Sequence, residues 1–228
     1  MYKLDFVNGR LLIIDLHLNG KTVVIVGAGN EALKRIKLLE NEECQIIVIG
    51  EKPNFEISKL SRTKKITLKK IKLSSPLFLK KYKPFLVIAS TTDQLLNQKI
   101  VETAKKMKIL AYASDSSELS DISYLSLIDI KKTIKIAIST GGSSPIMAKK
   151  IKSKTEKCLK KNISNQDIQL IKFQKFARSE SKKFISTQVE RKKFLYALMN
   201  DKRVKELLKD GKYKPIQTII KKMVKNWQ

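Results

Sequence analysis

The sequence predicts an α/β fold with a Rossmann-like parallel sheet at the N-terminus, a small β-containing region and a C-terminal helical domain. Over residues 21–113, short apolar segments alternate with segments of helical spacing, as in a parallel sheet with crossover helices. Two segments within 122–139 alternate between apolar and polar residues and predict antiparallel strands. From Pro145 onward the apolar spacing is helical. We therefore expect three domains, namely residues 1–113, 114–150 and 151–228.

The individual elements follow from apolar, often β-branched runs that end at glycine, proline or polar residues. Residues 54–82 form a Lys-rich crossover in which we expect only one weak strand. The predicted strands lie at residues 11–16, 23–26, 45–49, 66–68, 85–89, 109–113, 122–130 and 133–139. The predicted helices lie at residues 30–41, 95–107, 146–161, 165–186, 187–199, 201–209 and 215–226.

A glycine turn after the strand at 23–26 is the first functional signal. Gly27 permits a tight turn, Gly29 removes a side chain where a ligand would approach, and Ala32 allows close helix–strand packing. The following helix directs free backbone N–H groups toward an anion such as a pyrophosphate. The same pattern also fits an ordinary strand–helix turn of another α/β protein. The cofactor contacts expected in this stretch are Gly27, Gly29, Asn30 and Glu31.

An acidic residue lies at the end of the next strand. Glu51 comes 22 positions after Gly29, close to where the dinucleotide fingerprint places an acid for the ribose hydroxyls. We therefore expect NAD as the cofactor. Lys52 beside Glu51 could accommodate a 2′-phosphate, so NADP remains an alternative.

Two later strands also end in polar residues. Thr91 and Thr92 follow the strand at 85–89, and Asp115 follows the strand at 109–113. The carboxyl ends of parallel strands meet at one edge of a sheet, where open α/β folds bind ligands. We expect these residues to line one crevice with the glycine turn. Asp115 could equally be a turn-forming residue that caps the next segment.

The chain is strongly basic. It has 48 Lys and Arg against 21 Asp and Glu, a formal net charge of +27. Residues 149–228 carry 24 basic and 7 acidic side chains. This excess predicts a polyanionic partner, which could be nucleic acid, an anionic membrane surface or a small ligand with many carboxylates or phosphates. Lysines that are merely solvated, in an organism with a Lys-biased proteome, would explain the charge equally well.

Membrane, metal and disulfide features are not predicted. No apolar run reaches the ~18–20 residues of a membrane span, and no signal-peptide pattern is visible, so we expect a cytoplasmic protein. Cys44 and Cys158 are far apart and form no C-x-x-C motif, which argues against a metal centre or disulfide scaffold.

With these landmarks in order, the sequence resembles the precorrin-2 dehydrogenase family, the single-module relatives of the N-terminal part of siroheme synthase. The resemblance covers nearly the whole chain. The segments that carry it are Val26 to Ala32, Ala89 to Asp93 with Asn97, Asp115, Ile136 to Pro145, and Glu190 to Phe194.

The resemblance implies a homodimer that transfers hydride from precorrin-2 to NAD⁺ and produces sirohydrochlorin. It also implies that Asp115 acts as a general acid or base, although a purely electrostatic anchor remains the alternative. Some members of the family insert Fe²⁺ into the product as well. Thr92 departs from the family pattern, and no metal ligands are predicted, so chelatase activity is left open.

The resemblance suggests a function for the hydroxyl-rich loop before Pro145. Its backbone N–H groups and hydroxyls could bind substrate carboxylates. It could instead cap the following helix, with glycines fitted to a dimer contact. The substrate contacts expected here are Ser139, Thr140, Gly141, Gly142 and Ser143.

Two other functions compete with the dehydrogenase. One is a Rossmann module that binds NAD as a sensor or structural dimer without turnover. The other is a nucleic-acid-binding protein, which the charge suggests but which lacks a recognisable binding module or interleaved aromatic residues.

Overall fold

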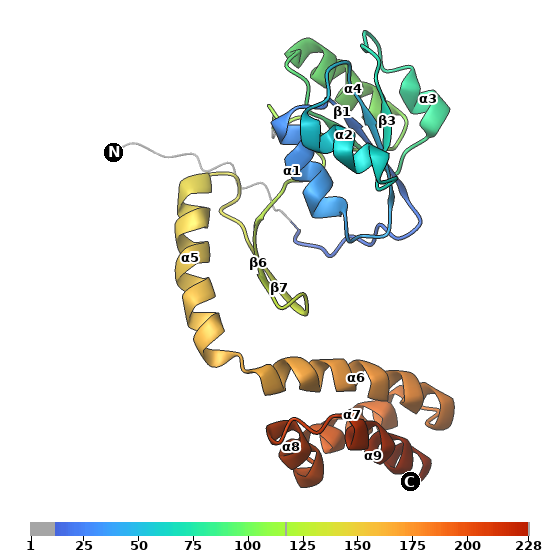
Figure 1. Cartoon of the computed structure of the whole chain (residues 1–228), viewed down its shortest axis with the longest axis vertical. Coiled ribbons are helices and arrows are strands. Elements are labelled where there is room, and N and C mark those ends of the chain that lie inside the picture. The colour runs from blue at the N-terminus through green and yellow to red at the C-terminus, as the bar shows by residue number, and fades with distance from the viewer. Residues whose placement is uncertain (1–11, 117, 228) are drawn as a thin grey trace. The chain divides into compact units, whose positions relative to one another are not determined.

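A five-stranded parallel sheet is the centre of the N-terminal half in the computed structural model, which describes residues 12–116 and 118–227 (Figure 1). Its strand order is β3-β2-β1-β4-β5. The chain therefore runs outward from β1 to β3 and then returns to the other side of β1. This reversal places the topological switch point between β1 and β4. The strands are β1 (Thr22–Val26), β2 (Gln45–Ile49), β3 (Thr67–Lys69), β4 (Leu86–Ala89) and β5 (Leu110–Ala113).

The sheet is buried on both faces, which explains its continuous apolar runs. Val24 and Val26 belong to one core cluster, and Val23 and Ile25 belong to the other. Helices α1 and α2 pack into the cluster of Val23, whereas α3 and α4 pack into the cluster of Val24. The helices are α1 (Asn30–Leu39), α2 (Phe55–Arg62), α3 (Phe78–Tyr82) and α4 (Gln94–Lys106).

Side chains close the outer edge of β5. The Ala111 N–H donates to Asp121 Oδ2 at 3.0 Å, and the Ala113 N–H donates to Ser120 Oγ at 2.9 Å. The Asp121 N–H donates back to the Ala111 carbonyl at 2.8 Å. These bonds satisfy an edge strand that would otherwise expose its donors and acceptors. They also hold the chain that follows Asp115 against the sheet.

A two-stranded sheet and a series of helices make up the C-terminal half. Strands β6 (Ser126–Ile130) and β7 (Ile134–Ile138) are antiparallel, as predicted, and α5 (Pro145–Asn162) contacts both. Lys131 and Lys132 form the connecting turn with φ values of 52° and 54°. The remaining helices are α6 (Asn165–Phe184), α7 (Gln188–Asn200), α8 (Lys202–Lys209) and α9 (Lys214–Lys225).

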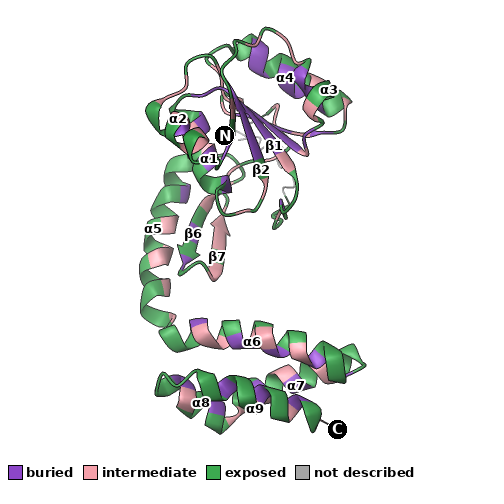
Figure 2. Cartoon of the chain, turned by 45° about the vertical axis from the view of Figure 1, so that its right-hand side comes forward, coloured by how far each residue is buried: buried purple, intermediate pink, exposed green. Residues whose placement is uncertain are grey.

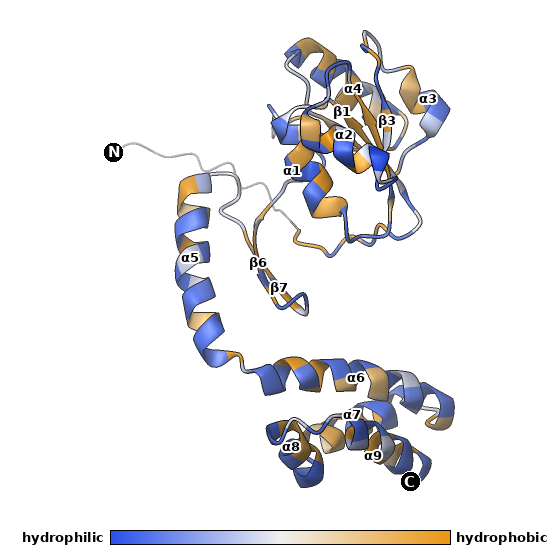
Figure 3. Cartoon of the chain, viewed as in Figure 1, coloured by the Kyte–Doolittle hydropathy of each residue, from blue (hydrophilic) through white to orange (hydrophobic). Residues whose placement is uncertain are grey.

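Helices α6 to α9 share a separate apolar core. Phe194, Leu198 and Ile216 are fully buried in it, and exposed faces separate the buried positions along each helix (Figure 2). The alternation of polar and apolar residues along these helices is visible in Figure 3. No helix among the described residues is long and apolar enough to cross a membrane.

The chain divides into two compact units, residues 1–124 and 125–228, called unit 1 and unit 2 below. The three-domain division proposed from the sequence stays a prediction. The predicted α/β fold is confirmed in its parallel sheet, small antiparallel sheet and C-terminal helices.

Two expectations were wrong. Residues 12–16 of the expected strand at 11–16 form no strand, and Leu12, Ile13 and Ile14 are exposed; Leu11 lies outside the described residues. The Lys-rich crossover contains helices α2 and α3, which were not predicted. Both are short, with eight and five residues, and only Ile57 of α2 and Phe78 and Leu79 of α3 are buried, so few apolar positions mark them in the sequence.

Candidate cofactor and catalytic site

The carboxyl ends of the strands in unit 1 form a continuous row. Val26 pairs with Ile49 and Ala89, and Ala89 pairs with Ala113. The hydrogen bonds continue one residue further, from Gly27 N to Ile49 O at 2.8 Å, from Ser90 N to Val26 O at 2.8 Å and from Ser114 N to Ala89 O at 2.9 Å. The predicted residues after β1, β2, β4 and β5 therefore start from one edge of the sheet.

The glycines of this edge have different functions. Gly27 has a φ of +110°, and a Cβ there would lie 2.3 Å from the carbonyl oxygen of Ser90. A Cβ on Gly50 would lie 2.7 Å from the Ala28 Cβ. These two glycines allow strand ends to approach each other. At Gly29, by contrast, a Cβ would meet nothing within 4 Å, so its missing side chain leaves open space for a ligand.

The N-terminus of α1 is available to an anion. Gly29 is its N-cap and offers no side-chain cap, whereas Asn54 caps α2 and Asp93 caps α4. The first N–H groups of a helix have no partner inside it, and the helix dipole is positive there. This geometry fits the pyrophosphate of a dinucleotide.

Asn30 and Glu31 of α1, both predicted to contact the cofactor, each bond to another side chain of the protein. Lys34 donates a hydrogen bond to Glu31, which is the main reason why the pKa of Glu31 is lowered. Asn30 Oδ1 accepts from Asn54 Nδ2 at 3.3 Å, and Asn54 N donates to Ala28 O at 3.0 Å. The asparagine pair thus ties the start of α2 to the glycine turn, a link that the sequence analysis did not identify.

Glu51 and Lys52 follow β2 and are exposed. In the part of the chain that the structure describes, neither side chain makes a hydrogen bond or an ion pair. A dinucleotide whose pyrophosphate lies at α1 would extend its adenosine ribose toward the end of β2 in this fold. Both side chains are free to contact the ribose there.

Asp115 is joined to the end of β4 by a buried amide. Asn97 of α4 is only 1% exposed, and its Nδ2 donates to Asp115 Oδ2 at 2.9 Å. Thr91 donates to Asn97 Oδ1 from its backbone N–H at 3.2 Å and from its Oγ1 at 2.7 Å. Thr91 and Asp115 are therefore brought together, while Thr92 is exposed beside them. The carboxylate of Asp115 is itself exposed and could accept a proton.

An aromatic cluster below the crevice was not predicted. Arg35 Nη2 donates to the Tyr112 hydroxyl at 2.8 Å, and the Arg35 guanidinium lies 4.3 Å from the centre of the Tyr124 ring. The two tyrosine rings meet edge to face at 4.9 Å. Burial raises the pKa of Tyr124 to about 12. The cluster fixes the last residues of unit 1 against α1 and β5.

The hydroxyl-rich loop belongs to unit 2 and satisfies much of its own backbone. Ser139 Oγ accepts from Gly141 N at 3.1 Å, and Thr140 Oγ1 accepts from Ser144 N at 3.1 Å. Ser144 caps α5 by accepting from Met147 N. These bonds support the helix-cap interpretation. The Ser143 N–H also bonds within the loop, to the Thr140 carbonyl at 3.0 Å, and Gly141 and Gly142 have φ values of 63° and 84°.

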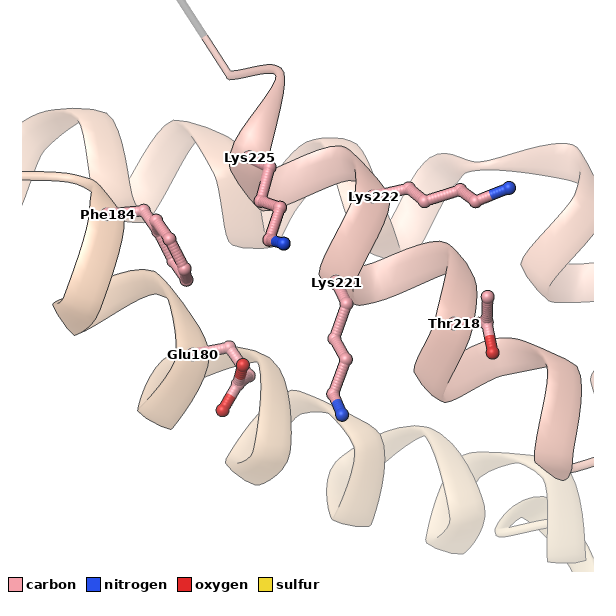
Figure 4. A pocket seen from close by; sticks show the side chains of 6 residues that line it. All are labelled: Glu180, Phe184, Thr218, Lys221, Lys222 and Lys225. Atoms are coloured by element: carbon pink, nitrogen blue, oxygen red, sulfur yellow. The ribbon is translucent and has the colours of Figure 1, made fainter.

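A hollow between α6 and α9 in unit 2 contains none of the predicted residues (Figure 4). It is basic because three lysines come from α9, while Glu180 on α6 pairs with Lys183. Its carboxylate is engaged in that ion pair, and none of the residues at the strand ends lines it, so we assign the site to the strand ends of unit 1. The lining residues are Glu180, Phe184, Thr218, Lys221, Lys222 and Lys225.

Comparison with known proteins shows what this chain is similar to. A family model described as "Putative NAD(P)-binding" matches residues 14–126, which include the whole parallel sheet. The chain is 28% identical over 215 residues to siroheme synthase of Buchnera aphidicola subsp. Acyrthosiphon pisum, with 94% of this chain and 44% of that protein covered. It is also 28% identical to siroheme synthase of Actinobacillus succinogenes, with 85% of this chain and 39% of that protein covered. Together with the NAD(P)-binding match, these similarities support the siroheme synthase and precorrin-2 dehydrogenase family for this chain.

The fold of the chain agrees with that of a solved structure. The structure of SirC, precorrin-2 dehydrogenase, superimposes with a TM-score of 0.67 at 23% identity, covering 93% of this chain and all of that one. The chain spans less than half the length of the two siroheme synthases. The NAD(P)-binding match supports NAD as the cofactor. Among the described residues, no group of three or more His, Cys, Asp or Glu could hold a metal ion.

Proposed function

We propose that this chain is an NAD-dependent dehydrogenase that oxidises precorrin-2 to sirohydrochlorin. The observation that carries the proposal is the anchored carboxylate of Asp115, which follows β5, two strands from the glycine turn after β1. A group that handles protons thus starts from the same sheet edge as the dinucleotide crevice. The names of the siroheme synthase and precorrin-2 dehydrogenase relatives supply the substrate.

Different residues at the sheet edge bind different parts of the cofactor. The N–H groups at the start of α1 hold the pyrophosphate, Gly29 gives it room, and Glu51 binds the ribose hydroxyls. Lys52, Thr91 and Thr92 complete the cofactor contacts. When bound, the nicotinamide accepts a hydride from the tetrapyrrole. The protein's own chemical contribution is proton transfer.

Asp115 is proposed as the base. Its Oδ2 is held by Asn97, so its Oδ1 accepts the proton that leaves the tetrapyrrole as the hydride departs. General-base assistance of this kind contributes roughly 10²–10⁴ in rate. An electrostatic role for Asp115 would also depend on its negative charge, but it would require no proton transfer.

The net charge of +27 supports a substrate that carries many carboxylates. We assign carboxylate binding to the loop of Ser139, Thr140, Gly141, Gly142 and Ser143. A Cβ on either glycine would meet nothing within 4 Å, so an anion could approach the loop, where it would compete with the internal bonds of the Gly141 and Ser143 N–H groups.

We further propose a homodimer located in the cytoplasm. Ile134, Ile136 and Ile138 of β7 are only half-buried in the monomer, which supports further burial by a second copy. Both cysteines are free thiols, as is typical of a reducing compartment. Sedimentation equilibrium of the purified chain tests the dimer.

The deciding experiment incubates the purified chain anaerobically with precorrin-2 and NAD⁺. We expect NADH and sirohydrochlorin to appear in equal amounts, and neither to form without NAD⁺. A parallel reaction with NADP⁺ measures the cofactor preference, and addition of Fe²⁺ or Co²⁺ to the product tests metal insertion. Binding of NAD⁺ without any NADH would instead favour the sensor or structural role. Salt-sensitive nanomolar binding of duplex DNA would favour the nucleic-acid role.

A further inference from the structure

Asn97 is a buried polar residue that contacts the proposed base Asp115. In the described part of the chain, the buried polar or charged side chains are Asn97 and Ser181. Ser181 Oγ bonds only to the Arg178 carbonyl of its own helix. Asn97, by contrast, connects three segments, because its bonds run from α4 to the end of β4 and to the residue after β5.

The partners of Asn97 fix the orientation of its amide. The Thr91 backbone N–H can only donate, and it lies 3.2 Å from one terminal atom of the Asn97 side chain. That atom must therefore be the oxygen. The other terminal atom lies 3.1 Å from the Thr91 carbonyl oxygen, which can only accept, so it must be the nitrogen. This same NH₂ group is the one that faces Asp115 Oδ2.

We propose that Asn97 is a positioning residue for the reaction, whose NH₂ group holds Oδ2 of Asp115 and leaves Oδ1 to face the substrate. The proposal rests on the proposed dehydrogenase function. Among the described residues, the exposed side chain of Asp115 has Asn97 as its hydrogen-bond partner, and Asn97 is itself buried in a helix and held on both sides by Thr91. A carboxylate fixed at one oxygen presents the other in a defined direction, which is what proton transfer from a bound substrate needs.

The competing explanation is that Asn97 merely ties the end of β4 to α4. Its bonds with Thr91 would be enough for that, and the contact with Asp115 would then be incidental. The two explanations differ in what happens when the contact is reversed or made repulsive.

A melting experiment tests the contact without any substrate. Asn97→Asp keeps the acceptor for Thr91 but places a carboxylate oxygen against Asp115 and against the Thr91 carbonyl. We expect its melting temperature to fall by about 4–8 °C. Combining it with Asp115→Asn reverses the hydrogen bond, with position 115 donating and position 97 accepting. The double variant should recover at least half of the loss. A double variant that melts no higher than Asn97→Asp alone would overturn the contact.

Kinetics test the positioning role. Asn97→Asp should lower kcat for precorrin-2 oxidation by about 10–100-fold, because a displaced base is costly, while the KM for NAD⁺ stays within about threefold. Gln98→Ala is the matched control, since Gln98 is the next residue of α4, is exposed and bonds only to Glu102. It should leave kcat and KM unchanged.

Two kinetic results count against the positioning role. A folded Asn97→Asp variant with near wild-type kcat would leave Asn97 a structural residue only. A wild-type chain without any turnover would refute the proposed function and the positioning role together, whereas the melting data would still report whether the contact exists.

Discussion

Alanine substitutions at two glycines of the same turn should have different effects, one on folding and the other on cofactor binding. At Gly27 the added Cβ would lie 2.3 Å from Ser90 O and 2.7 Å from Ser90 C, and both atoms belong to a backbone that cannot move freely. At Gly29 the added Cβ would meet nothing within 4 Å. The first substitution therefore affects folding, whereas the second affects only what binds above the turn.

The magnitudes follow from the backbone geometry. A φ of +110° costs an alanine roughly 1–2 kcal/mol, and overpacking against the Ser90 backbone adds about 1–3 kcal/mol. Gly27→Ala should therefore destabilise unit 1 by about 2–5 kcal/mol. Gly29 has a φ of −90°, which alanine adopts without strain. Loss of a glycine N-cap costs at most about 1 kcal/mol, while a methyl group in the path of the pyrophosphate should weaken NAD⁺ binding at least about tenfold.

Urea unfolding followed by circular dichroism, together with calorimetric titration of NAD⁺, separates these effects. Trp227 is the only tryptophan and packs against Phe194 in unit 2, so its fluorescence follows unit 2 as an internal control. The Trp227 transition should not move in either variant. The reasoning is refuted if Gly27→Ala unfolds at the wild-type urea concentration, or if Gly29→Ala binds NAD⁺ as tightly as the wild-type chain.

Three further outcomes are expected. Asp115→Asn should lower kcat by at least about 10²-fold while the dissociation constant for NAD⁺ stays within about threefold, which single-turnover kinetics and calorimetry measure. The free energy of unfolding should fall as the pH rises from about 10 to about 12. Over that range Tyr124 has lost its phenolic proton in the unfolded chain but still keeps it when buried in the fold. Urea midpoints across that range should fall by the equivalent of about 2–3 kcal/mol, and by less in Tyr124→Phe. Phe194→Ala should cost unit 2 about 3–5 kcal/mol, seen as an early Trp227 fluorescence transition.

The strands of the parallel sheet could be predicted because each is an apolar run buried on both faces. Gln45–Ile49, for example, has the same bounds in the sequence prediction and in the structure. The short segment before the sheet was misjudged for the converse reason. Leu12, Ile13 and Ile14 have the composition of a strand, but the described structure gives them no neighbouring strand to pair with. Composition predicts the tendency to form a strand, and pairing decides whether one forms.

The part of the candidate site that lies at the ends of the parallel strands could be predicted from the sequence. Once Glu51, Thr91 and Asp115 are placed after strands, parallel topology brings them to one edge. The amide that joins Thr91 to Asp115 was not assigned a role, because a polar residue inside a helical segment is most often solvated. Only the packing of α4 against the sheet shows that Asn97 is buried and shared between two strand ends.

Helix α1 begins without a side-chain cap at the proposed cofactor site. Helices α2, α4, α5, α6, α7 and α8 each begin with a side chain that accepts a backbone N–H, whereas α3 and α9, like α1, do not. A serine or aspartate at Gly29 would cap α1 in the same way and stabilise it by about a few tenths of a kcal/mol. It would also occupy the open space above the turn and satisfy the N–H groups internally. A helix that lacks a cap at the switch point of the sheet keeps those donors for an anion from outside the chain, which supports assigning the pyrophosphate to this position.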